Sequence, residues 1–200
     1  MDGDVAPRGA PEMKKYFLLF LFLCVASAGF FIGRPAYSKE ESLACEIPNF
    51  HVVAPGVMRG AQPSADALGC LREYYGVKTI LDLRDDMTHI EWEKEIVEKQ
   101  GMLFISIPMN SSQEQGVEKI EQCLGILNDK SKQPVFVHCE AGKDRAGMIV
   151  AAYRIKYDNW NIKDALLEML SYGYDPIGCF KLEEALSRWD SWRQDNTQVH

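Results

Sequence analysis

The sequence has no excess of basic residues. Its 22 lysines and arginines stand against 29 aspartates and glutamates, which gives a formal net charge of −7 at pH 7. After residue 38 the balance is 18 basic to 26 acidic side chains, a net charge of −8. An acidic chain argues against nucleic acid as a partner and against broad attachment to anionic lipid. A phosphorylated substrate remains compatible, because an anion site needs only a local positive field.

The sequence also lacks internal repeats, low-complexity tracts and a cluster of metal ligands. The four histidines, at positions 51, 89, 138 and 200, are scattered, so we predict neither a metal nor another cofactor. With 26% charged and 46% hydrophobic residues among 200, the composition fits one globular domain with its own core.

Charge is missing altogether from residues 16–33, which follow Lys14 and Lys15. This pattern of a positive start and an apolar run, with small residues at Ala36 and Ser38, is typical of a signal peptide cleaved after Ser38. We therefore predict export, to the periplasm or outside the cell. The alternative is an uncleaved membrane anchor through residues 16–33, with the domain outside the cytoplasm, because 18 helical residues span about 27 Å.

The cysteine count is odd once this segment is set aside. Of six cysteines, Cys24 lies in the apolar run and five remain, so an exported protein keeps at least one free thiol. Cys139 is our candidate for it. The other four can pair in three ways or be buried as apolar side chains, and helical context favours burial for Cys70 and Cys123. These four are Cys45, Cys70, Cys123 and Cys179.

Strand and helix patterns alternate along the chain after a lead-in over residues 39–49. We expect strands near 50–53, 57–60, 78–83, 103–107 and 134–137, and helices near 65–75, 89–100, 117–127 and from 146 onward, with only helices in the C-terminal third. Ser64 is a good cap for the first helix, and Gly76 a good stop. This order predicts an α/β fold in residues 50–195, with a central, mainly parallel sheet flanked by helices.

The most informative segment is residues 138–145, His-Cys-Glu-Ala-Gly-Lys-Asp-Arg. An apolar strand precedes it and an apolar helix follows it. A tight loop between a strand and a helix N-terminus binds phosphate with its backbone N–H groups. The same field favours the thiolate form of Cys139. Arg145 can hold two phosphate oxygens with its planar guanidinium group.

This segment resembles the active-site loop of the cysteine-dependent protein tyrosine and dual-specificity phosphatases, His-Cys-x5-Arg. The variant here is similar to the bacterial and lipid-directed branches. Residues 56–64 are similar to the Arg-x-x-Gln-Pro segment of small atypical dual-specificity phosphatases, and residues 76–84 to the strand ending in Asp-Leu-Arg that follows it. The resemblance covers about residues 50–160 and implies the dual-specificity phosphatase fold.

The resemblance implies hydrolysis of a phosphomonoester in two steps. Cys139 attacks phosphorus and forms a cysteinyl-phosphate, while Arg145 and the backbone N–H groups hold the equatorial oxygens. His138 orients and stabilises the loop. Lys143 adds positive charge toward a second phosphate or an acidic flank. The phosphate-binding set is Glu140, Ala141, Gly142, Lys143 and Arg145.

Two departures from the family pattern concern the chemistry. Residues 107–114 contain no aspartate where a general acid is usual. Asp144 is our first choice instead, because some lipid-directed relatives carry an aspartate there; Asp85, Asp86 and Glu114 are second choices. Ala146 replaces the usual Ser or Thr after the arginine, so we expect slow hydrolysis of the intermediate and a burst of product.

Three functions remain open. The first is a protein tyrosine or dual-specificity phosphatase acting on phosphoproteins. The second applies the same chemistry to phosphoinositides or inositol phosphates, and a substrate panel separates the two. The third is a phosphate-binding module without catalysis, suggested by Ala146 and the missing aspartate. Intact Cys139 and Arg145 favour an enzyme.

Overall fold

The structure, a computed structural model, describes residues 46–197. The signal peptide or anchor predicted for residues 1–38, and most of the lead-in segment, lie outside these residues. Within the described part, no helix is long and apolar enough to cross a membrane. The residues expected to form the catalytic domain are all described up to position 195.

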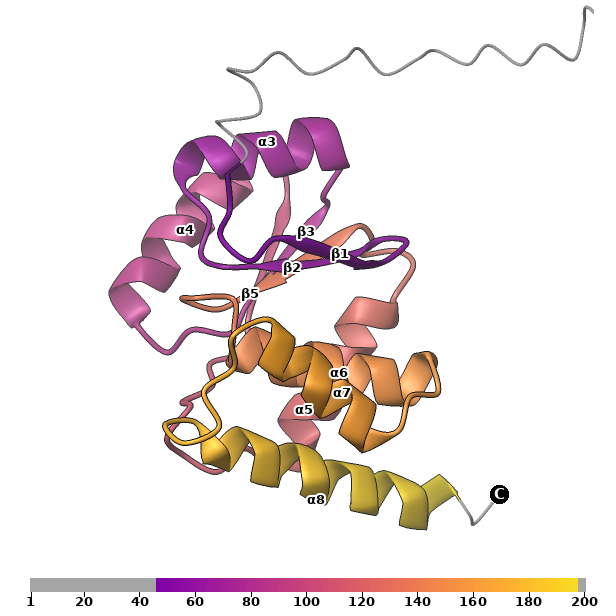
Figure 1. The fold of residues 1–200 in the computed structure, drawn as a ribbon. Coiled ribbons are helices and arrows are strands. Elements are labelled where there is room, and N and C mark those ends of the chain that lie inside the picture. Colours follow the sequence, from indigo (N-terminus) through magenta and orange to yellow (C-terminus); the bar gives the residue numbers. More distant parts are fainter. Residues whose placement is uncertain (1–45, 198–200) are drawn as a thin grey trace, which may run out of the picture. The chain divides into compact units, whose positions relative to one another are not determined.

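A five-stranded sheet forms the centre of the domain (Figure 1). Its strands are β1 (His51–Ala54), β2 (Val57–Gly60), β3 (Thr79–Asp82), β4 (Leu103–Ser106) and β5 (Val135–His138). The spatial order is β1-β2-β5-β3-β4, and only the β1–β2 pair is antiparallel. The predicted α/β fold with a mainly parallel sheet is confirmed. Strand β5 is central, with a parallel neighbour on each side.

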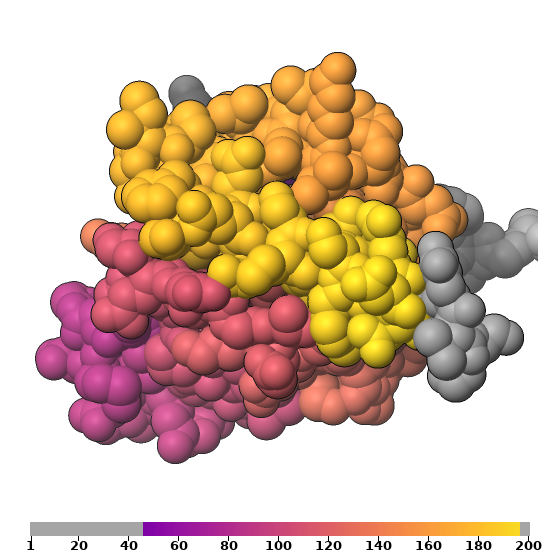
Figure 2. Space-filling model, turned by 90° about the horizontal axis from the view of Figure 1, so that it is seen from below, coloured from indigo at the N-terminus to yellow at the C-terminus, as the bar shows by residue number. Residues whose placement is uncertain are grey.

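Within residues 46–197, six helices flank the sheet: α3 (Ala65–Tyr75), α4 (Met87–Lys99), α5 (Val117–Asn128), α6 (Arg145–Tyr157), α7 (Ile162–Ser171) and α8 (Phe180–Thr197). Figure 1 shows α3 and α4 on one side of the sheet and the other four on the opposite side. In Figure 2, α8 lies in yellow across this second side, between the orange segment that includes α7 and the pink segment that includes α5.

The alternation of side chains in β5 explains these two layers. Val135 and Val137 belong to the core formed with α5, α6, α7 and α8, while Phe136 belongs to the core formed with α3 and α4. All three side chains are fully buried. A strand buried on both faces needs apolar residues at every position, and this is the pattern of a parallel central strand.

Caps fix the helix limits that the sequence predicts. The Ser64 hydroxyl accepts a hydrogen bond from the Ala67 N–H (3.1 Å), and Gly76 ends α3 at φ 65°. Helix α4 begins two residues before the predicted start. There the Asp86 carboxylate accepts a hydrogen bond from the Thr88 N–H (3.1 Å) and so caps the helix earlier.

The cysteines follow the expectation only in part. Cys123 is buried and free, as predicted, and Cys139 and Cys179 are also free. Cys70 is disulfide-bonded, so the preference for a merely buried thiol there was wrong. The prediction rested on the position of Cys70 inside a helix. The residue is indeed buried, but burial is compatible with either a free thiol or a disulfide. A disulfide depends on the position of a partner, which local sequence does not give.

Candidate active site

Strand β5 places Cys139 at the carboxyl edge of the sheet, between β2 and β3. The side chain is 2% exposed. The chain then turns through Gly142 and enters α6 at Arg145. The structure therefore has the strand, loop and helix N-terminus that the sequence predicts, with the cysteine and the arginine at the two ends of the loop.

The carbonyl groups of the loop are held from outside by the rest of the domain. Each of three successive carbonyl oxygens accepts a hydrogen bond from a different segment. The donors are the Gln62 N–H to Glu140 (3.1 Å), Asn49 Nδ2 to Ala141 (2.8 Å) and Arg59 Nη2 to Gly142 (2.6 Å). Among the described residues, no backbone N–H group of residues 140–145 donates a hydrogen bond. The loop thus keeps its donors for an anion.

Gly142 allows the loop to pack against the end of β2. Its φ is +69°, a conformation that suits glycine. A Cβ atom there would lie 2.4 Å from the Gly60 carbonyl carbon and 2.5 Å from the Ala61 nitrogen. Both atoms are backbone, so neither can move aside easily. The inner glycine of the motif is therefore required by close approach as well as by conformation.

Arg59 supports the loop from the inside of the domain. It is 1% exposed, its Nη2 donates to the carbonyls of Gly142 (2.6 Å) and Lys143 (3.3 Å), and its guanidinium lies 4.7 Å from the centre of the Tyr172 ring. Burial lowers the pKa of Arg59, and the charge of Cys139 opposes this shift. A buried cation is therefore near enough to the cysteine for their charges to interact.

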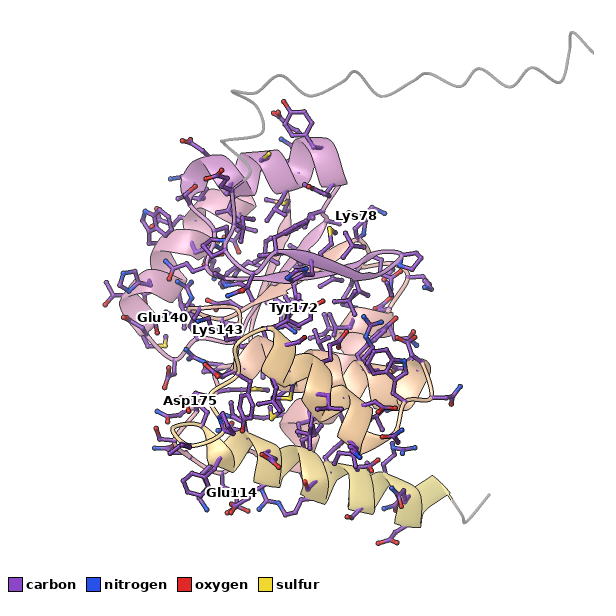
Figure 3. All side chains as sticks on the ribbon, in the orientation of Figure 1. Lys78, Glu114, Glu140, Lys143, Tyr172 and Asp175 are labelled. Atoms are coloured by element: carbon purple, nitrogen blue, oxygen red, sulfur yellow. The ribbon has the colours of Figure 1, made fainter. Side chains whose placement is uncertain are left out.

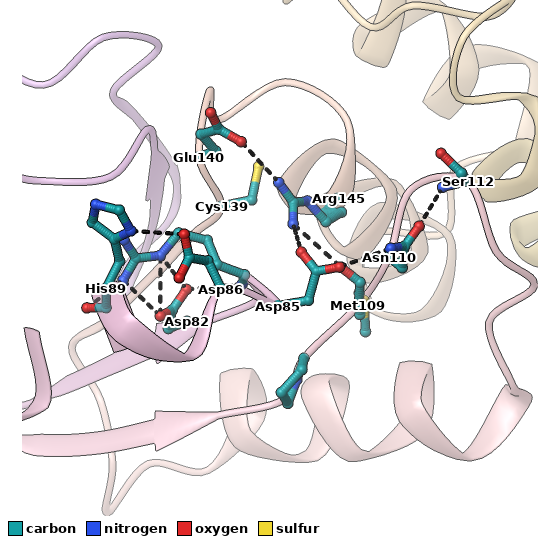
Figure 4. A network of polar contacts seen from close by, with 12 residues as sticks. Asp82, Asp85, Asp86, His89, Met109, Asn110, Ser112, Cys139, Glu140 and Arg145 are labelled. Atoms are coloured by element: carbon teal, nitrogen blue, oxygen red, sulfur yellow. Dashed lines mark hydrogen bonds and ion pairs between the residues drawn. The ribbon is translucent and has the colours of Figure 1, made fainter. Parts of the chain in front are cut away.

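Arg145 faces the front of the loop (Figure 4). The Cys139 sulfur points toward its guanidinium group. Nη1 lies 3.0 Å from Asp85 Oδ1 and donates to the Met109 carbonyl (3.2 Å), and Nη2 lies 3.7 Å from Glu140 Oε2. The side chain is 11% exposed. Arg145 is thus placed to hold a phosphate group and is balanced by carboxylates in its absence.

A polar cleft of about 170 Å³ opens in front of Arg145. Its lining contains three carboxylates and two arginines, together with His89 and Gln62. The charged members are Asp85, Asp86, Glu140, Arg84 and Arg145. The lining distinguishes three of the four candidate acids. Asp85 and Asp86 line the cleft, whereas Glu114 forms an ion pair with Arg188 and is absent from the lining.

Asp144, the first candidate acid, contacts the segment after α7. Its Oδ1 accepts a hydrogen bond from the Asp175 N–H (3.0 Å), and the residue does not line the cleft. Asp85 has the opposite placement. Its Oδ1 contacts Arg145, and its Oδ2 accepts a hydrogen bond from Asn110 Nδ2 (2.8 Å). Asp85 is thus the candidate acid that contacts Arg145, whereas Asp144 contacts the segment after α7.

His138 belongs to a buried charge network behind the loop. Its Nε2 lies 3.0 Å from Glu93 Oε1, and Arg84 donates to both Glu93 and Asp82, the latter at 2.8 Å. All four side chains are buried. Ligand atoms of Asp82, Glu93 and His138 lie within 4.8 Å of one another, a spacing that suits a metal. Arg84 already supplies positive charge to both carboxylates, so the network explains this spacing without an ion.

Two of these residues were missed by sequence reasoning. Arg59 stands in the segment that carried part of the resemblance, and an arginine within a buried strand pattern was the signal for it. Glu93 lies on the same helix face as Ile90 and Val97, so helical spacing already placed a carboxylate among core positions. The predicted phosphate-binding residues 140–145 are brought together in one loop, with Ala146 buried behind it.

A sequence family described as a DSP-PTPase phosphatase fused to NAD+ kinase matches residues 44–176. This match includes the whole sheet and the loop. The chain belongs to this family of dual-specificity-type phosphatases. As a member, it is a cysteine-dependent phosphatase, and the alternative of a binding module without catalysis is set aside.

Two curated relatives illustrate the range of this family. The chain is 25% identical over 167 residues to the dual specificity protein phosphatase TpbA of Pseudomonas aeruginosa, which covers 78% of this chain and 73% of TpbA. It is 30% identical over 116 residues to the inositol diphosphatase DSP2 of Oryza sativa, which covers 56% of this chain and 55% of that protein.

Solved structures agree with the fold. The crystal structure of TpbA superposes with a TM-score of 0.62 at 22% identity, over 74% of this chain and 90% of TpbA. The catalytic domain of the PP-IP phosphatase SIW14 from S. cerevisiae superposes with a TM-score of 0.61 at 20% identity, over 68% of this chain and 85% of that one. The dual-specificity phosphatase fold predicted from the sequence is confirmed.

Proposed function

We propose that this phosphatase works through a cysteinyl-phosphate on Cys139. The loop between Cys139 and Arg145 carries the proposal. Its carbonyl groups accept hydrogen bonds from the rest of the domain, and its described backbone N–H groups remain available to an anion. The thiolate attacks phosphorus, the P–S bond forms and the bond from phosphorus to the leaving oxygen breaks. Arg145 and the loop N–H groups stabilise the charge on the equatorial oxygens.

In the second step, water attacks the phosphocysteine. The P–S bond breaks, inorganic phosphate leaves and the thiolate returns. Arg59 is a buried positive charge that interacts with the charge of Cys139, and it supports the departure of the sulfur as an anion. Ala146 offers no hydroxyl to the same sulfur, so this step is expected to limit turnover.

The leaving oxygen needs a proton in the first step, and we assign this role to Asp85. A bound phosphate competes with Asp85 for Arg145, which frees the carboxyl group inside the cleft. Asn110 keeps hold of the other carboxyl oxygen and fixes its direction. Asp144 instead accepts a hydrogen bond from the Asp175 N–H, and no described contact joins its carboxylate to Arg145.

The substrate is a phosphorylated molecule, and we place phosphoproteins first. The name of TpbA describes a dual specificity protein phosphatase, and a second TpbA structure holds phosphotyrosine. Inositol phosphates are the second candidate, because the rice relative and SIW14 are named for that chemistry.

The intermediate can be trapped directly. We expect acid quenching during turnover of a phosphotyrosine peptide to leave one phosphoryl group on the peptide that contains Cys139, detected by mass spectrometry. Arg145→Lys should lower the amount trapped, and Cys139→Ser should abolish the thiophosphate. Phosphorylation of another residue, with Cys139 unmodified, would contradict the proposal.

We also propose export after cleavage at Ser38, with a membrane anchor as the alternative. The uncharged run over residues 16–33 supports this, and so does the disulfide at Cys70, because disulfides persist in oxidising compartments. N-terminal sequencing of the protein from its native host tests it. A chain that begins at Lys39 is expected, and a chain that retains Tyr16 would contradict cleavage.

A further inference from the structure

The rim of the cleft carries more negative than available positive charge. Asp85, Asp86 and Glu140 all line it. Of the two arginines in the lining, Arg84 is buried and already paired with the carboxylates of Asp82 and Glu93. Arg145 is therefore the one arginine or lysine of the described cleft lining that a substrate can engage. His89, the other basic residue of the lining, lies 2.8 Å from Asp86 Oδ2.

Glu140 is the most exposed of these carboxylates. It follows the nucleophile directly, its side chain is 81% exposed, and its described ion-pair partner is Arg145 at 3.7 Å. Figure 3 labels Glu140 and Lys143 near each other at the loop that follows β5. The Lys143 stem runs along Gly173, within 3.3–3.6 Å of the position a Cβ would take there, and Lys143 is not part of the cleft lining. Among the described ion pairs, none joins Lys143 to a carboxylate of the cleft.

Such a site binds a single phosphate well and further negative charge poorly. The loop and Arg145 supply donors for one phosphate group. A second phosphate on the same molecule would lie against carboxylates at the rim, and like charges repel. A cationic side chain beside the phosphate would instead meet Asp86 or Glu140, and complementary charge selects partners at an exposed site.

We propose that this acidic rim selects phosphomonoesters flanked by cationic groups, as in phosphotyrosine segments of protein that contain lysine or arginine, and disfavours polyphosphorylated substrates. The inference rests on the proposed function and names its substrate class. Glu140 and Asp86 are the specificity-determining residues, and as two exposed carboxylates they are expected to contribute about equally.

The experiment compares two phosphotyrosine peptides with one sequence, in which the flanking positions are either lysine and arginine or glutamate and aspartate. The full chain is assayed on both, and on para-nitrophenyl phosphate and inositol hexakisphosphate. We expect kcat/KM to be about tenfold higher for the basic peptide at low salt, which corresponds to two exposed ion pairs of about 0.7 kcal/mol each. The ratio should shrink as salt rises.

Glu140→Lys should reverse the preference, and Glu140→Gln should reduce it to about threefold. Glu73→Lys is the matched control, because it makes the same change of charge on an exposed position of α3 outside the cleft, and should leave the ratio unchanged. Equal rates on both peptides, or faster turnover of inositol hexakisphosphate, would overturn the inference while activity on para-nitrophenyl phosphate persists. Absence of that activity would overturn the proposed function, and the inference with it.

Discussion

Arg59 shows how much of the site depends on a residue that never meets the substrate. It connects β2 to the loop by hydrogen bonds to two carbonyl groups, and its positive charge interacts with that of Cys139. Its cost is burial, which its stacking on Tyr172 offsets in part. We expect Arg145 to bind phosphate in the correct geometry only when Arg59 holds the loop in its observed conformation.

Replacing Arg59 by Met should damage catalysis more than binding. The two hydrogen bonds from a charged donor are each worth about 1.5–3 kcal/mol, so we expect kcat to fall by about 100-fold. Steady-state kinetics on para-nitrophenyl phosphate, together with thermal unfolding, measure both effects. Arg59→Lys is the control, because lysine keeps the charge but cannot reach both carbonyl groups. Its kcat should lie between those of the parent and Arg59→Met. An Arg59→Met variant with normal kcat would contradict this role.

The choice between Asp85 and Asp144 is tested by leaving groups. Asp85→Asn should lower kcat by about 100-fold on phenyl phosphate, which needs a proton, and by less than about threefold on para-nitrophenyl phosphate. Asp144→Asn should lower both rates equally, since its carboxylate braces the Asp175 segment. If Asp144→Asn alone shows the leaving-group dependence, the assignment to Asp85 is wrong.

The motif residues were predictable one by one, but their contacts were not. Cys139, Arg145 and the loop glycine follow from local spacing, and the structure places them as expected. Asp85 was only a second choice for the general acid. It lies 60 positions from Arg145 in the sequence, and the fold brings the two side chains into contact. Local sequence does not report which loops converge at one edge of a parallel sheet.

At the scale of elements, the loop is fixed by its neighbours rather than by its own sequence. β2 supplies Arg59 and the backbone against which Gly142 packs. β3 supplies Asp82, and α4 supplies Glu93, which together with Arg84 surround His138. The helix and strand patterns predicted these elements well, since their apolar periodicity and caps are local. The short strands were placed to within one or two residues.

Gly142→Ala should therefore disrupt the loop although the change adds one methyl group. The added Cβ meets backbone atoms at 2.4–2.5 Å, at a φ of +69°. We expect a loss of stability of about 3 kcal/mol and of activity by about 100-fold. Denaturant unfolding and kcat on para-nitrophenyl phosphate measure them.

Gly125→Ala in α5 is the control for this substitution. Nothing lies within 4 Å of a Cβ there, and the residue is in a helix. Alanine should raise the free energy of unfolding by about 1 kcal/mol and leave activity unchanged. Equal and small effects at both positions would show that Gly142 is not held against β2.

At the scale of the whole molecule, the free energy of unfolding should fall at alkaline pH because of the buried Cys123 thiol. Burial raises the pKa of Cys123 from 9.0 to about 12. Above pH 9 the unfolded chain loses this proton while the folded protein keeps it, so stability is complete below pH 9 and falls as pH rises toward 12. The fall amounts to about 4 kcal/mol at its limit.

Denaturant unfolding between pH 8 and 11 measures this slope. Cys123→Ala should be less stable at pH 8, because it leaves a small cavity, but should lose less stability as pH rises. Identical slopes for the two proteins would mean that Cys123 is ionised as easily in the folded state as in the unfolded one.

The proposed chemistry of the whole molecule depends on Cys139 as the nucleophile. The most direct measurement is the hydrolysis of para-nitrophenyl phosphate by the purified full chain under reducing conditions, with and without chelator, beside Cys139→Ser. We predict turnover by the parent that chelator does not change, and a loss of at least about 1,000-fold in Cys139→Ser while the variant unfolds at the same temperature. Turnover that survives in Cys139→Ser, or a folded and reduced parent without activity, would contradict the central claim.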